Sequence, residues 1–374
     1  MLKSFKFASN TSAGCANQHY FEPEDKGAHF TSRAYFRIDA GGEYNYSLLF
    51  SGVHDSSYRK ISIANQRCDY WQIHSARVAA CHTFPEGVAI ENIDPERDLQ
   101  HTEFIPLSFG GKTSVRATPD LFSTDPVRLR FEKGEYLCLE LEYSGERIPC
   151  HPEVIIPVYT KDEGAWTYTV NMPLPCMIGC DRAVEGRIAF LGDSITQGVG
   201  TTKNAYSHLA AFISDKLRNR YSVWNLGIGF GKASDAATDS AWLAKAKSCD
   251  TVFVCFGVND VNGDYTADSI KSSLSTIVER LQRAGCRVIL QTLPPYDHTE
   301  PKLSVWREVN RYIKDELSSV CDRVFDVSGV LSASESTPEK PGYGGHPNDE
   351  GNARWAEALF ESVKDMFFNS SSSR

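Results

Sequence analysis

The sequence predicts a two-domain protein in which an all-β sandwich precedes an α/β domain built on a parallel sheet. Its 374 residues are enough for two domains. Up to about residue 185, short β-like runs alternate with turns, and long helical periodicity is nearly absent. Beyond that point, apolar strands alternate with amphipathic helices, a pattern typical of βαβ units. We therefore place the domain boundary between residues 184 and 185.

Residues 1–184 are expected to form the β-sandwich domain. Four strand-like stretches support this prediction, in the order YNYSLLFSG, CDYWQIHSARVAAC, PVRLRFEKGEYLCLELEY and AWTYTVNMPL. Glycine, proline and aspartate residues mark the turns between them. Regularly spaced short strands separated by such turn residues are typical of a sandwich.

Residues 185–368 are expected to form the α/β domain. The predicted strands are RIAFLG, YSVWNLG, TVFVCFG, RVILQTLPP and RVFDVSG. Because the strands alternate with helices, they should run parallel with the helices packed on the sheet. The last residues, 369–374, are NSSSSR and are expected to be disordered. Helices are predicted near residues 205–219, 269–284, 302–318 and 350–367.

The composition argues against several classes of function. The hydrophobic content of 41% and the charged content of 23% are ordinary for a soluble globular protein. A net charge of −9 argues against a nucleic-acid partner, because phosphate binding needs a basic face. No apolar run approaches the length of a membrane span, and the first residues show no signal peptide. No membrane partner is therefore expected, and the oligomeric state is left open.

The cysteines indicate a reducing compartment. They number 11, an odd count, and lie scattered through strand-like segments. Buried free thiols explain this pattern best, so we expect a cytoplasmic protein. Cys176 and Cys180 lie four residues apart, but a zinc site would need a second ligand pair at similar spacing, and none is visible. No metal and no organic cofactor are expected.

Polar side chains follow several of the predicted strands at the point where each strand ends. Ser194 follows the strand 188–191, Asn259 follows TVFVCFG, and His346 lies in the loop before the last helix. Ligands of parallel α/β sheets bind outside the carboxyl ends of the strands. A serine after a strand is, by itself, more typical of a helix cap. The convergence of several such residues on one edge predicts a functional site.

The residue types at this edge suit acyl transfer. A serine hydroxyl is a weak nucleophile near neutral pH and needs a base such as histidine. The oxyanion of the tetrahedral intermediate needs preorganised donors. The N–H of Ser194, a glycine N–H from 229–231 and the Asn259 amide are expected to supply them. Asp193 and Asp260 are expected to hold turns by hydrogen bonds rather than to take part in catalysis.

Four motifs, GDSITQG, NLGIGFG, GVND and HPNDEG, occur in this order along the second domain. Together they resemble the Ser-Gly-Asn-His (SGNH, or GDSL-like) hydrolase family of esterases and acyl hydrolases, over residues 184–366. The resemblance implies a flavodoxin-like three-layer α/β/α fold, with Ser194 as nucleophile and His346 as base. The stretch that begins PLSFGGKTSVRATPD and ends EYLCLELEY further resembles the β-sandwich, expected to be jelly-roll-like, that precedes the catalytic domain in some members.

The sequence departs from this family near the histidine. The family carries an aspartate three residues before the histidine, but Tyr343 stands there and two glycines follow it. The third member of a triad orients the imidazole and stabilises its charged form. Three interpretations are open: a Ser–His dyad with a backbone carbonyl as acceptor, an acid from elsewhere such as Glu339, or an enzyme of reduced activity. We favour the dyad, and expect Asp349 to serve the last helix as a first-turn anion.

A second departure lies in the loop expected to bind the oxyanion. The family's oxyanion glycine falls five residues after the asparagine of the second motif, and here that position is Phe230, with glycines on both sides. A shift of one residue would make Gly231 the N–H donor, with Gly229 as the second choice. The expected oxyanion donors are therefore Ser194, Gly231 and Asn259.

The predicted activity is hydrolysis of short acyl esters, with acetyl as the favoured acyl group and a carbohydrate or another small molecule as the alcohol. A β-sandwich beside such a domain often narrows the site, and no long apolar lid is evident, which suits short acyl groups better than lipids. An acyltransferase that uses the same Ser–His machinery is the alternative. A catalytically weak carbohydrate-binding protein is a third interpretation, which rests on the missing aspartate alone.

Overall fold

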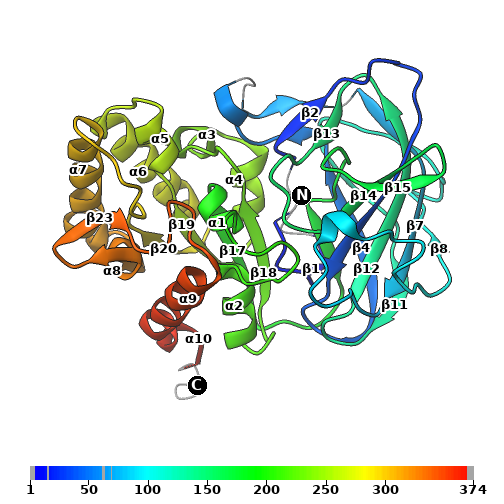
Figure 1. The fold of residues 1–374 in the computed structure, drawn as a ribbon. Coiled ribbons are helices and arrows are strands. Elements are labelled where there is room, and N and C mark those ends of the chain that lie inside the picture. The colour runs from blue at the N-terminus through cyan, green and yellow to red at the C-terminus, as the bar shows by residue number, and fades with distance from the viewer. Residues whose placement is uncertain (1–4, 15–16, 61–63, 69, 369–374) are drawn as a thin grey trace. The chain divides into compact units, whose positions relative to one another are not determined.

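The computed structural model describes residues 5–14, 17–60, 64–68 and 70–368 (Figure 1). The segment 369–374, for which we expect disorder, lies outside the described residues. The chain forms two compact units, Phe5–Ala183 and the chain from Val184 onward. No helix in the described part of the chain is long and apolar enough to cross a membrane.

The first unit is built from two antiparallel sheets. One sheet contains β1 (Ala8–Ser9), β16 (Met177–Cys180), β4 (Gly42–Ser51) and β10 (Leu121–Ser123), in that order, with β11 (Val127–Phe131) also paired to β4. The other runs in the order β15 (Ala165–Tyr168), β14 (Val158–Asp162), β3 (Phe30–Arg37), β12 (Tyr136–Gly145), β7 (Trp71–Cys81) and β8 (Ile105–Pro106), with β9 (Val115–Arg116) paired to β7. Short elements complete the unit: β2 (His19–Phe21) pairs with β13 (Ile148–Cys150), β5 (Val53–His54) pairs with β6 (Gln66–Arg67), and two 3-10 turns are η2 (Tyr58–Lys60) and η3 (Ile90–Asn92).

These two sheets form the predicted sandwich. Burial alternates along the strands: in β11, Leu129 and Phe131 are buried, while the arginine between them is exposed. This period of two gives each sheet one apolar face to bury. The Trp71 ring of β7 contacts the Phe122 ring of β10 with centroids 6.1 Å apart, so side chains of the two sheets meet in the core. The prediction of an all-β sandwich in front of the α/β domain is confirmed.

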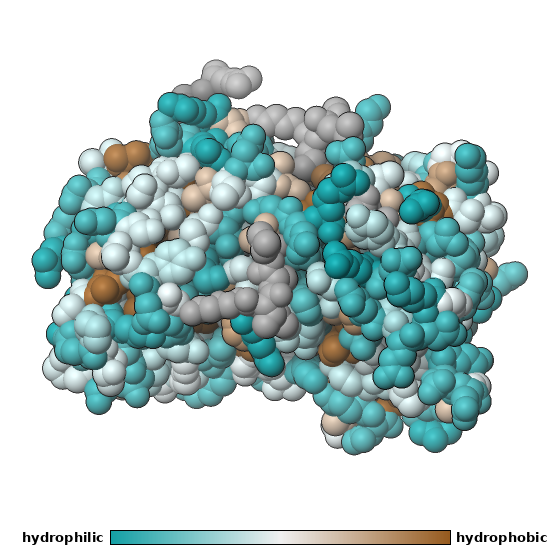
Figure 2. Space-filling view, turned by 90° about the horizontal axis from the view of Figure 1, so that it is seen from above, coloured by the Kyte–Doolittle hydropathy of each residue, from teal (hydrophilic) through white to brown (hydrophobic). Residues whose placement is uncertain are grey.

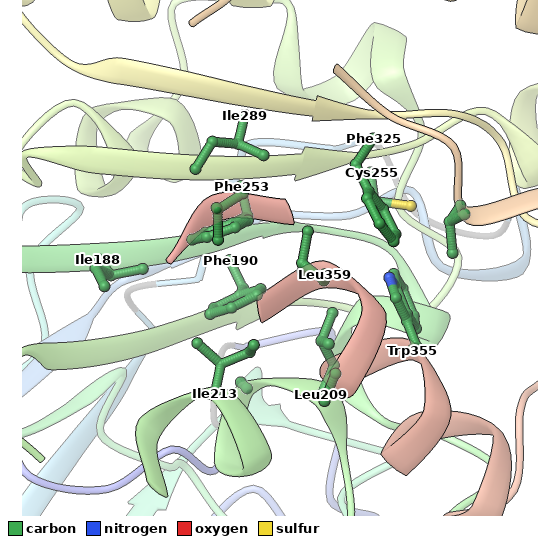
Figure 3. Close-up of a cluster of buried hydrophobic side chains, with 14 of the residues drawn as sticks. Ile188, Phe190, Leu209, Ile213, Phe253, Cys255, Ile289, Phe325, Trp355 and Leu359 are labelled. Carbon is green, nitrogen blue, oxygen red and sulfur yellow. The ribbon is translucent and has the colours of Figure 1, made fainter. Parts of the chain in front are cut away.

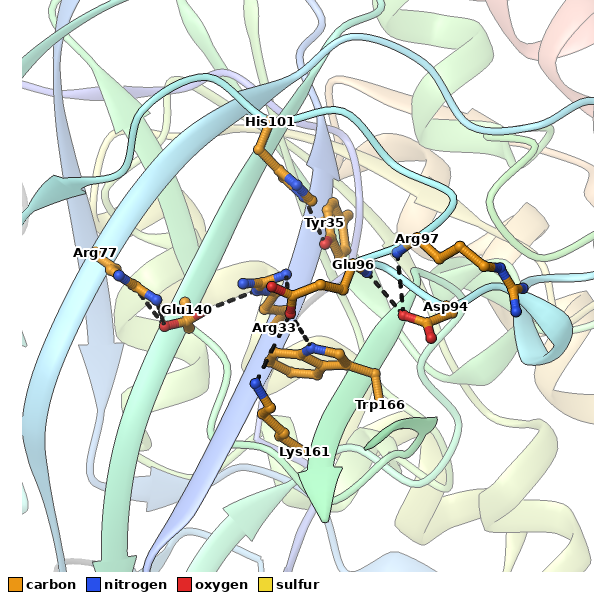
Figure 4. A network of polar contacts seen from close by, with 10 residues as sticks. All are labelled: Arg33, Tyr35, Arg77, Asp94, Glu96, Arg97, His101, Glu140, Lys161 and Trp166. Atoms are coloured by element: carbon orange, nitrogen blue, oxygen red, sulfur yellow. Dashed lines mark hydrogen bonds and ion pairs between the residues drawn. The ribbon is translucent and has the colours of Figure 1, made fainter. Parts of the chain in front are cut away.

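A charged network lies across three neighbouring strands of the larger sheet (Figure 4). Glu140 of β12 is the register partner of both Arg33 of β3 and Arg77 of β7. The Glu140 carboxylate accepts hydrogen bonds from Arg33 Nε at 2.7 Å and from Arg77 Nε at 2.6 Å. The Arg33 guanidinium also lies 4.4 Å from the centroid of the Trp166 ring. Because Arg33 and Glu140 are buried, their charges need these partners, and the network belongs to the architecture of the sandwich.

The second unit contains a parallel sheet of five strands. Their order is β18 (Ser222–Gly227), β17 (Arg187–Gly192), β19 (Thr251–Cys255), β20 (Arg287–Gln291) and β21 (Arg323–Phe325). A hairpin of β22 (Ser332–Ser334) and β23 (Thr337–Pro341) follows the sheet. The helices are α1 (Ser194–Gln197), α2 (Leu209–Lys216), α3 (Ala233–Ala236), α4 (Ala241–Ala246), α5 (Val258–Asn262), α6 (Ala267–Arg283), α7 (Lys302–Asp315), α8 (Val327–Leu331), α9 (Asp349–Val363) and α10 (Asp365–Phe368), with one 3-10 turn, η4 (Leu317–Ser319).

Helices cover both faces of this sheet (Figure 1). On one face, α2 and α9 contact each other and bury the cluster drawn in Figure 3. There the stacked rings of Phe190 and Phe253, with centroids 4.6 Å apart, lie in one core with Ile213 of α2 and Leu359 of α9. On the other face, α6 contacts β20, and α4 contacts β17 and β18. The predicted α/β/α layers with a parallel sheet are confirmed.

The long predicted helices are present, with one clear difference in their bounds. The predicted segment 269–284 corresponds to α6, which begins two residues earlier, and 302–318 contains α7. The predicted segment 350–367 corresponds to α9, which begins one residue earlier, and to most of α10. The helix predicted to begin near residue 205 begins only at Leu209. The residues before it form a loop in which Asn204 and Tyr206 have φ angles of 62° and 54°. Left-handed residues of this kind interrupt a right-handed helix, and a pattern of apolar residues does not reveal them.

The stacked pair in the sheet core gives a stability prediction. Phe190→Ala should lower the free energy of unfolding by about 3–5 kcal/mol, because it removes a buried ring and leaves a cavity against Phe253. Val320→Ala, at a position that is 49% exposed, should change it by less than about 0.5 kcal/mol. Urea titrations followed by tryptophan fluorescence measure both. Equal effects of the two substitutions would contradict the packing described here.

Candidate active site

The turn that carries Ser194 is shaped by two neighbouring residues. At Gly192, the last residue of β17, an added Cβ would lie 2.0 Å from Thr196 Oγ1 and 2.5 Å from the Cys255 carbonyl oxygen. Only glycine fits so close to these atoms. Asp193 is the N-cap of α1, and its Oδ1 accepts a hydrogen bond from the Ile195 N–H at 2.9 Å. Since the aspartate does the capping, the Ser194 hydroxyl is left to make another contact.

That contact is with His346. The Ser194 Oγ and the His346 Nε2 are 2.8 Å apart, across 152 positions of sequence. His346 lies in the loop before α9, whose N-cap is Asn348. Gly200, which follows α1 in the sequence, has φ 100°, and a Cβ there would lie 2.7 Å from the His346 carbonyl oxygen. The predicted nucleophile and the predicted base are therefore brought within hydrogen-bond distance.

Two side chains of α9 connect the start of this helix with the loop before α2 and with the first residue of α2. Asn352 is fully buried; its Nδ2 donates to the Pro347 carbonyl at 2.8 Å, and its Oδ1 accepts from the Leu209 N–H at 3.0 Å. Asp349 lies in the first turn of α9, as expected, but it also accepts hydrogen bonds from the loop before α2. These donors are the Thr202 N–H, the Thr202 hydroxyl and the Ser207 hydroxyl, at 2.8, 2.7 and 2.5 Å.

No acid contacts the imidazole among the described residues. The only hydrogen bond that the His346 ring makes with them is the one to Ser194. The Tyr343 hydroxyl accepts from Arg354 Nη1 at 3.1 Å, and the Tyr343 carbonyl accepts from the Asn348 N–H. The Glu339 carboxylate faces Arg307 Nη2 at 3.5 Å. The structure therefore brings neither the Glu339 carboxylate nor a backbone carbonyl to His346 Nδ1.

Burial sets the protonation state of the imidazole. It lowers the pKa of His346 below its ordinary value of 6.5, because a charged imidazolium loses hydration there. No charged side chain of the described residues opposes this shift. His346 is therefore neutral at pH 7, the form in which Nε2 can accept a proton from Ser194.

The loop expected to bind the oxyanion is held by side chains of α1 and α5. The Gln197 Oε1 accepts from the Gly229 N–H at 2.9 Å, and the Asn259 Nδ2 donates to the Gly231 carbonyl at 3.0 Å. The Gly231 N–H closes a turn by donating to the Ile228 carbonyl at 3.1 Å. The N–H groups of both candidate glycines are thus bonded to protein atoms, so the structure does not support Gly231 or Gly229 as a free donor at Ser194.

The other two expected oxyanion donors, the Ser194 N–H and the Asn259 amide, each have a hydrogen available. As the first residue of α1, Ser194 has no acceptor within the helix for its N–H. Asn259 is partly exposed, and its amide has two hydrogens, of which one is bonded to Gly231. Between the two glycines, Phe230 adopts φ 60°, the left-handed conformation that glycine would favour at this position. From the sequence we expected the oxyanion donor to move by one residue, from position 230 to Gly231. In the structure, Phe230 itself adopts the left-handed conformation of the turn, at a cost in backbone strain.

Asp260 anchors the same loop by hydrogen bonds, which is the role expected of it from the sequence. It is fully buried, and its carboxylate accepts from the Ala233 N–H at 2.9 Å and the Ser234 N–H at 3.4 Å. Burial raises the pKa of Asp260 to about 6, while these two backbone hydrogen bonds oppose the rise. Its role is to fix the start of α3, and it contacts neither Ser194 nor His346. Gln197, by contrast, was missed, because a glutamine after a GDS motif carries no signal of its own.

The class of this domain is now defined by its fold and by its family match. Residues 190–354 match the model of the GDSL-like Lipase/Acylhydrolase family. This match agrees with the Ser194–His346 contact at the carboxyl edge of a parallel sheet. The α/β domain of this chain is therefore a GDSL-like lipase/acylhydrolase domain over the matched residues 190–354.

Comparison with individual proteins gives more distant likenesses. A G-D-S-L family protein from Desulfitobacterium hafniense DCB-2 is 18% identical, covering 47% of this chain and 98% of its own, with a TM-score of 0.41. A mutant of Axe2, an acetyl-xylooligosaccharide esterase from Geobacillus Stearmophilus, is 19% identical over 51% and 99%, with a TM-score of 0.41. A carbohydrate esterase family 3 protein from Talaromyces cellulolyticus is 20% identical over 50% and 99%, with a TM-score of 0.40. An uncharacterised protein of Mycoplasma pneumoniae is 26% identical over 137 residues, and the match spans 33% of this chain and 15% of that protein.

The lowered pKa of His346 can be measured directly. An NMR titration of the imidazole should give a pKa below 6.5, with the signal assigned by its loss in His346→Gln. Between that value and pH 6.5, the unfolded chain binds this proton more readily than the folded chain. The contribution of His346 to stability should therefore decrease as the pH falls through this interval. A pKa above 6.5 would show that an acid reaches the ring.

Gly200 tests whether the position of His346 controls the reactivity of Ser194. Gly200→Ala should slow covalent labelling of Ser194 by a fluorophosphonate by about a hundredfold, because the new Cβ collides with the His346 backbone. Gly285→Ala is the matched control: its φ of 84° is also left-handed, but a Cβ there meets nothing within 4 Å. Labelling rates are compared by intact-protein mass spectrometry. If Gly200→Ala and Gly285→Ala are labelled equally slowly, backbone strain rather than displacement of His346 causes the slower labelling.

Proposed function

We propose that this protein is a serine esterase that hydrolyses short acyl esters through an acyl-enzyme on Ser194. The observation that carries the proposal is the 2.8 Å hydrogen bond between Ser194 Oγ and the Nε2 of His346, whose pKa is lowered by burial. A neutral imidazole in contact with a serine hydroxyl is the arrangement that activates this weak nucleophile. The family match over residues 190–354 supports the same chemistry.

The proposed reaction uses these groups in two steps. His346 Nε2 takes the hydroxyl proton as Ser194 Oγ bonds to the ester carbonyl carbon, and the Ser194 N–H and the free Asn259 amide hydrogen bind the resulting oxyanion. The intermediate expels the alcohol, which leaves with the proton from His346. Water then gives its proton to His346 and attacks the acyl-enzyme. Collapse of the second intermediate returns the proton to Ser194 and releases the carboxylic acid.

The distribution of exposed hydrophobic side chains favours a short acyl group in the substrate. A long acyl chain needs a contiguous apolar surface. Among the described residues, the large hydrophobic side chains that are well exposed are few and scattered: Tyr70, Val88, Ile105 and Val320. Figure 2 shows one face of the molecule, on which hydrophobic residues occur singly among hydrophilic ones. Acetyl is therefore the acyl group we propose, and a carbohydrate alcohol stays a prediction from the sequence.

Ester hydrolysis and its dependence on Ser194 are the test of this function. The protein should hydrolyse p-nitrophenyl acetate, more slowly p-nitrophenyl octanoate, and release acetate from acetylated xylose. Ser194→Ala should lower kcat at least about a thousandfold, because the nucleophile is gone. Ser272→Ala, an exposed serine on α6, should not change it. Activity that survives in Ser194→Ala would overturn the proposal, and acyl transfer to an added alcohol in preference to water would favour the acyltransferase.

Asn259 gives a second test, on the transition state. Asn259→Ala should lower kcat by about a hundredfold to a thousandfold and leave KM nearly unchanged, because its amide acts on charge that develops during the reaction. Steady-state kinetics with p-nitrophenyl acetate separate the two parameters, and circular dichroism checks the fold. A loss confined to KM would mean that Asn259 binds the substrate and does not stabilise the oxyanion.

A further inference from the structure

The imidazole of His346 is oriented without a hydrogen-bond acceptor from the described residues, so another contact must hold it. Its ring does have a second neighbour besides Ser194, the ring of Tyr296. The two centroids are 6.2 Å apart and the ring planes meet at 81°. This edge-to-face arrangement is a favoured geometry for aromatic pairs. Tyr296 lies in the loop that follows β20.

The ring of Tyr296 also lies against the backbone that leads into His346. At Gly345, the residue before the histidine, an added Cβ would be 3.1 Å from Tyr296 Cε2 and 3.4 Å from its Cδ2. Any larger side chain there would therefore press on the tyrosine. Tyr296 thus contacts both the imidazole and the preceding residue, which restricts the position of the loop as well as the direction of the ring.

Tyr296 is itself held firmly. The N–H groups of Tyr296 and Asp297 both donate to the Glu339 carbonyl of β23 at 3.2 Å. At the start of the loop, Asn310 Oδ1 of α7 accepts from the Leu293 N–H at 2.7 Å, and Trp306 Nε1 donates to the Pro294 carbonyl at 2.9 Å. The loop is therefore tied to α7 on one side and to the hairpin before the His346 loop on the other. A residue held in this way can transmit a fixed position to the imidazole.

We propose that Tyr296 is the positioning residue of His346, and that its ring fixes the imidazole by packing, where a Ser-His-Asp triad uses a carboxylate. The proposal deepens the proposed function and rests on it, because it concerns the same Ser194–His346 pair. Tyr296 takes no part in proton transfer. It acts by keeping Nε2 directed at Ser194 Oγ.

This arrangement explains why the histidine is held and yet stays neutral. A carboxylate would orient the ring and raise the pKa of His346, whereas an aromatic ring orients it and excludes water, which lowers the pKa. The Tyr296 ring also contacts the ring of His298, with centroids 5.5 Å apart. The pKa of His298 is lowered to about 4, mainly by burial and then by the positive charge of Lys302. The negative charge of Asp297 opposes this shift but has a smaller effect. His298 is thus neutral at pH 7 and adds no charge beside the Tyr296 ring.

The experiment compares three substitutions of Tyr296 by two readouts that do not require ester turnover. In Tyr296→Ala, fluorophosphonate labelling of Ser194 should slow at least about tenfold, because the imidazole loses its alignment. The pKa of His346 in the same variant should rise toward 6.5, because water reaches the ring. Tyr296→Phe should keep the labelling rate within about twofold of the wild type, since the ring suffices. Tyr296→Leu fills much of the space without a flat ring and should also label slowly, which keeps the test informative if the alanine variant unfolds.

Tyr312→Ala is the matched control. Tyr312 is a partly exposed tyrosine of α7 whose hydroxyl contacts Ser275, and it makes no contact with His346. The substitution Tyr312→Ala should leave both the labelling rate of Ser194 and the pKa of His346 unchanged. Normal labelling and an unchanged pKa in folded Tyr296→Ala or Tyr296→Leu would overturn the proposal, and so would a loss in Tyr296→Phe equal to that in Tyr296→Ala. Failure of the wild type to hydrolyse any ester would refute the proposed function, while these two readouts would still report on the positioning of His346.

Discussion

The hydrogen bond between Ser194 and His346 is the interaction on which the site depends. It joins the end of β17 to the loop before α9, so it forms only if these two segments are held together. The sheet core does part of this, because Trp355 and Leu359 of α9 are buried in one cluster with Phe190 of β17. The polar face of α9 does the rest: Asp349 binds the loop before α2, and Asn352 binds Leu209, the first residue of α2. The contacts that stabilise the α/β unit therefore also set the geometry of the site.

The oxyanion loop shows how backbone strain can be held at a functional site. A non-glycine residue in the left-handed region costs about 1–2 kcal/mol. Phe230 has φ 60°, and the residues on either side of it are fixed by side chains of two helices, Gly229 by Gln197 of α1 and Gly231 by Asn259 of α5. These bonds lock the turn from both ends, which is the condition under which such strain persists. Asp260 then fixes the start of α3, which follows the loop directly.

Regular packing made most of the fold predictable. The helix α6 has apolar residues on one face and charged residues on the other, and its position follows from that period alone. The parallel strands are continuous apolar runs, since helices cover both of their faces. The hairpin of β22 and β23 was missed, because its residues are largely polar and only partly buried, so it leaves no alternating pattern. The helices α3, α5 and α8 were missed as well, because four or five residues are too few to show a helical period.

The order of motifs along the chain was enough to predict which residue types meet at the edge of the sheet. Ser194 and Asn259 follow two recognisable parallel strands, whose carboxyl ends lie on one side of the sheet, and His346 precedes a recognisable helix. Which atoms are available there depends on how the folded loops pack. Whether the Gly231 N–H faces a ligand or closes a turn depends on the path of a loop, and the sequence contains only its three glycines. Likewise, the contact of Tyr296 with His346 joins residues 50 positions apart through packing, which leaves no motif. Spacing along the chain predicts secondary structure, whereas hydrogen-bond partners are set by distances that exist only after the chain has folded.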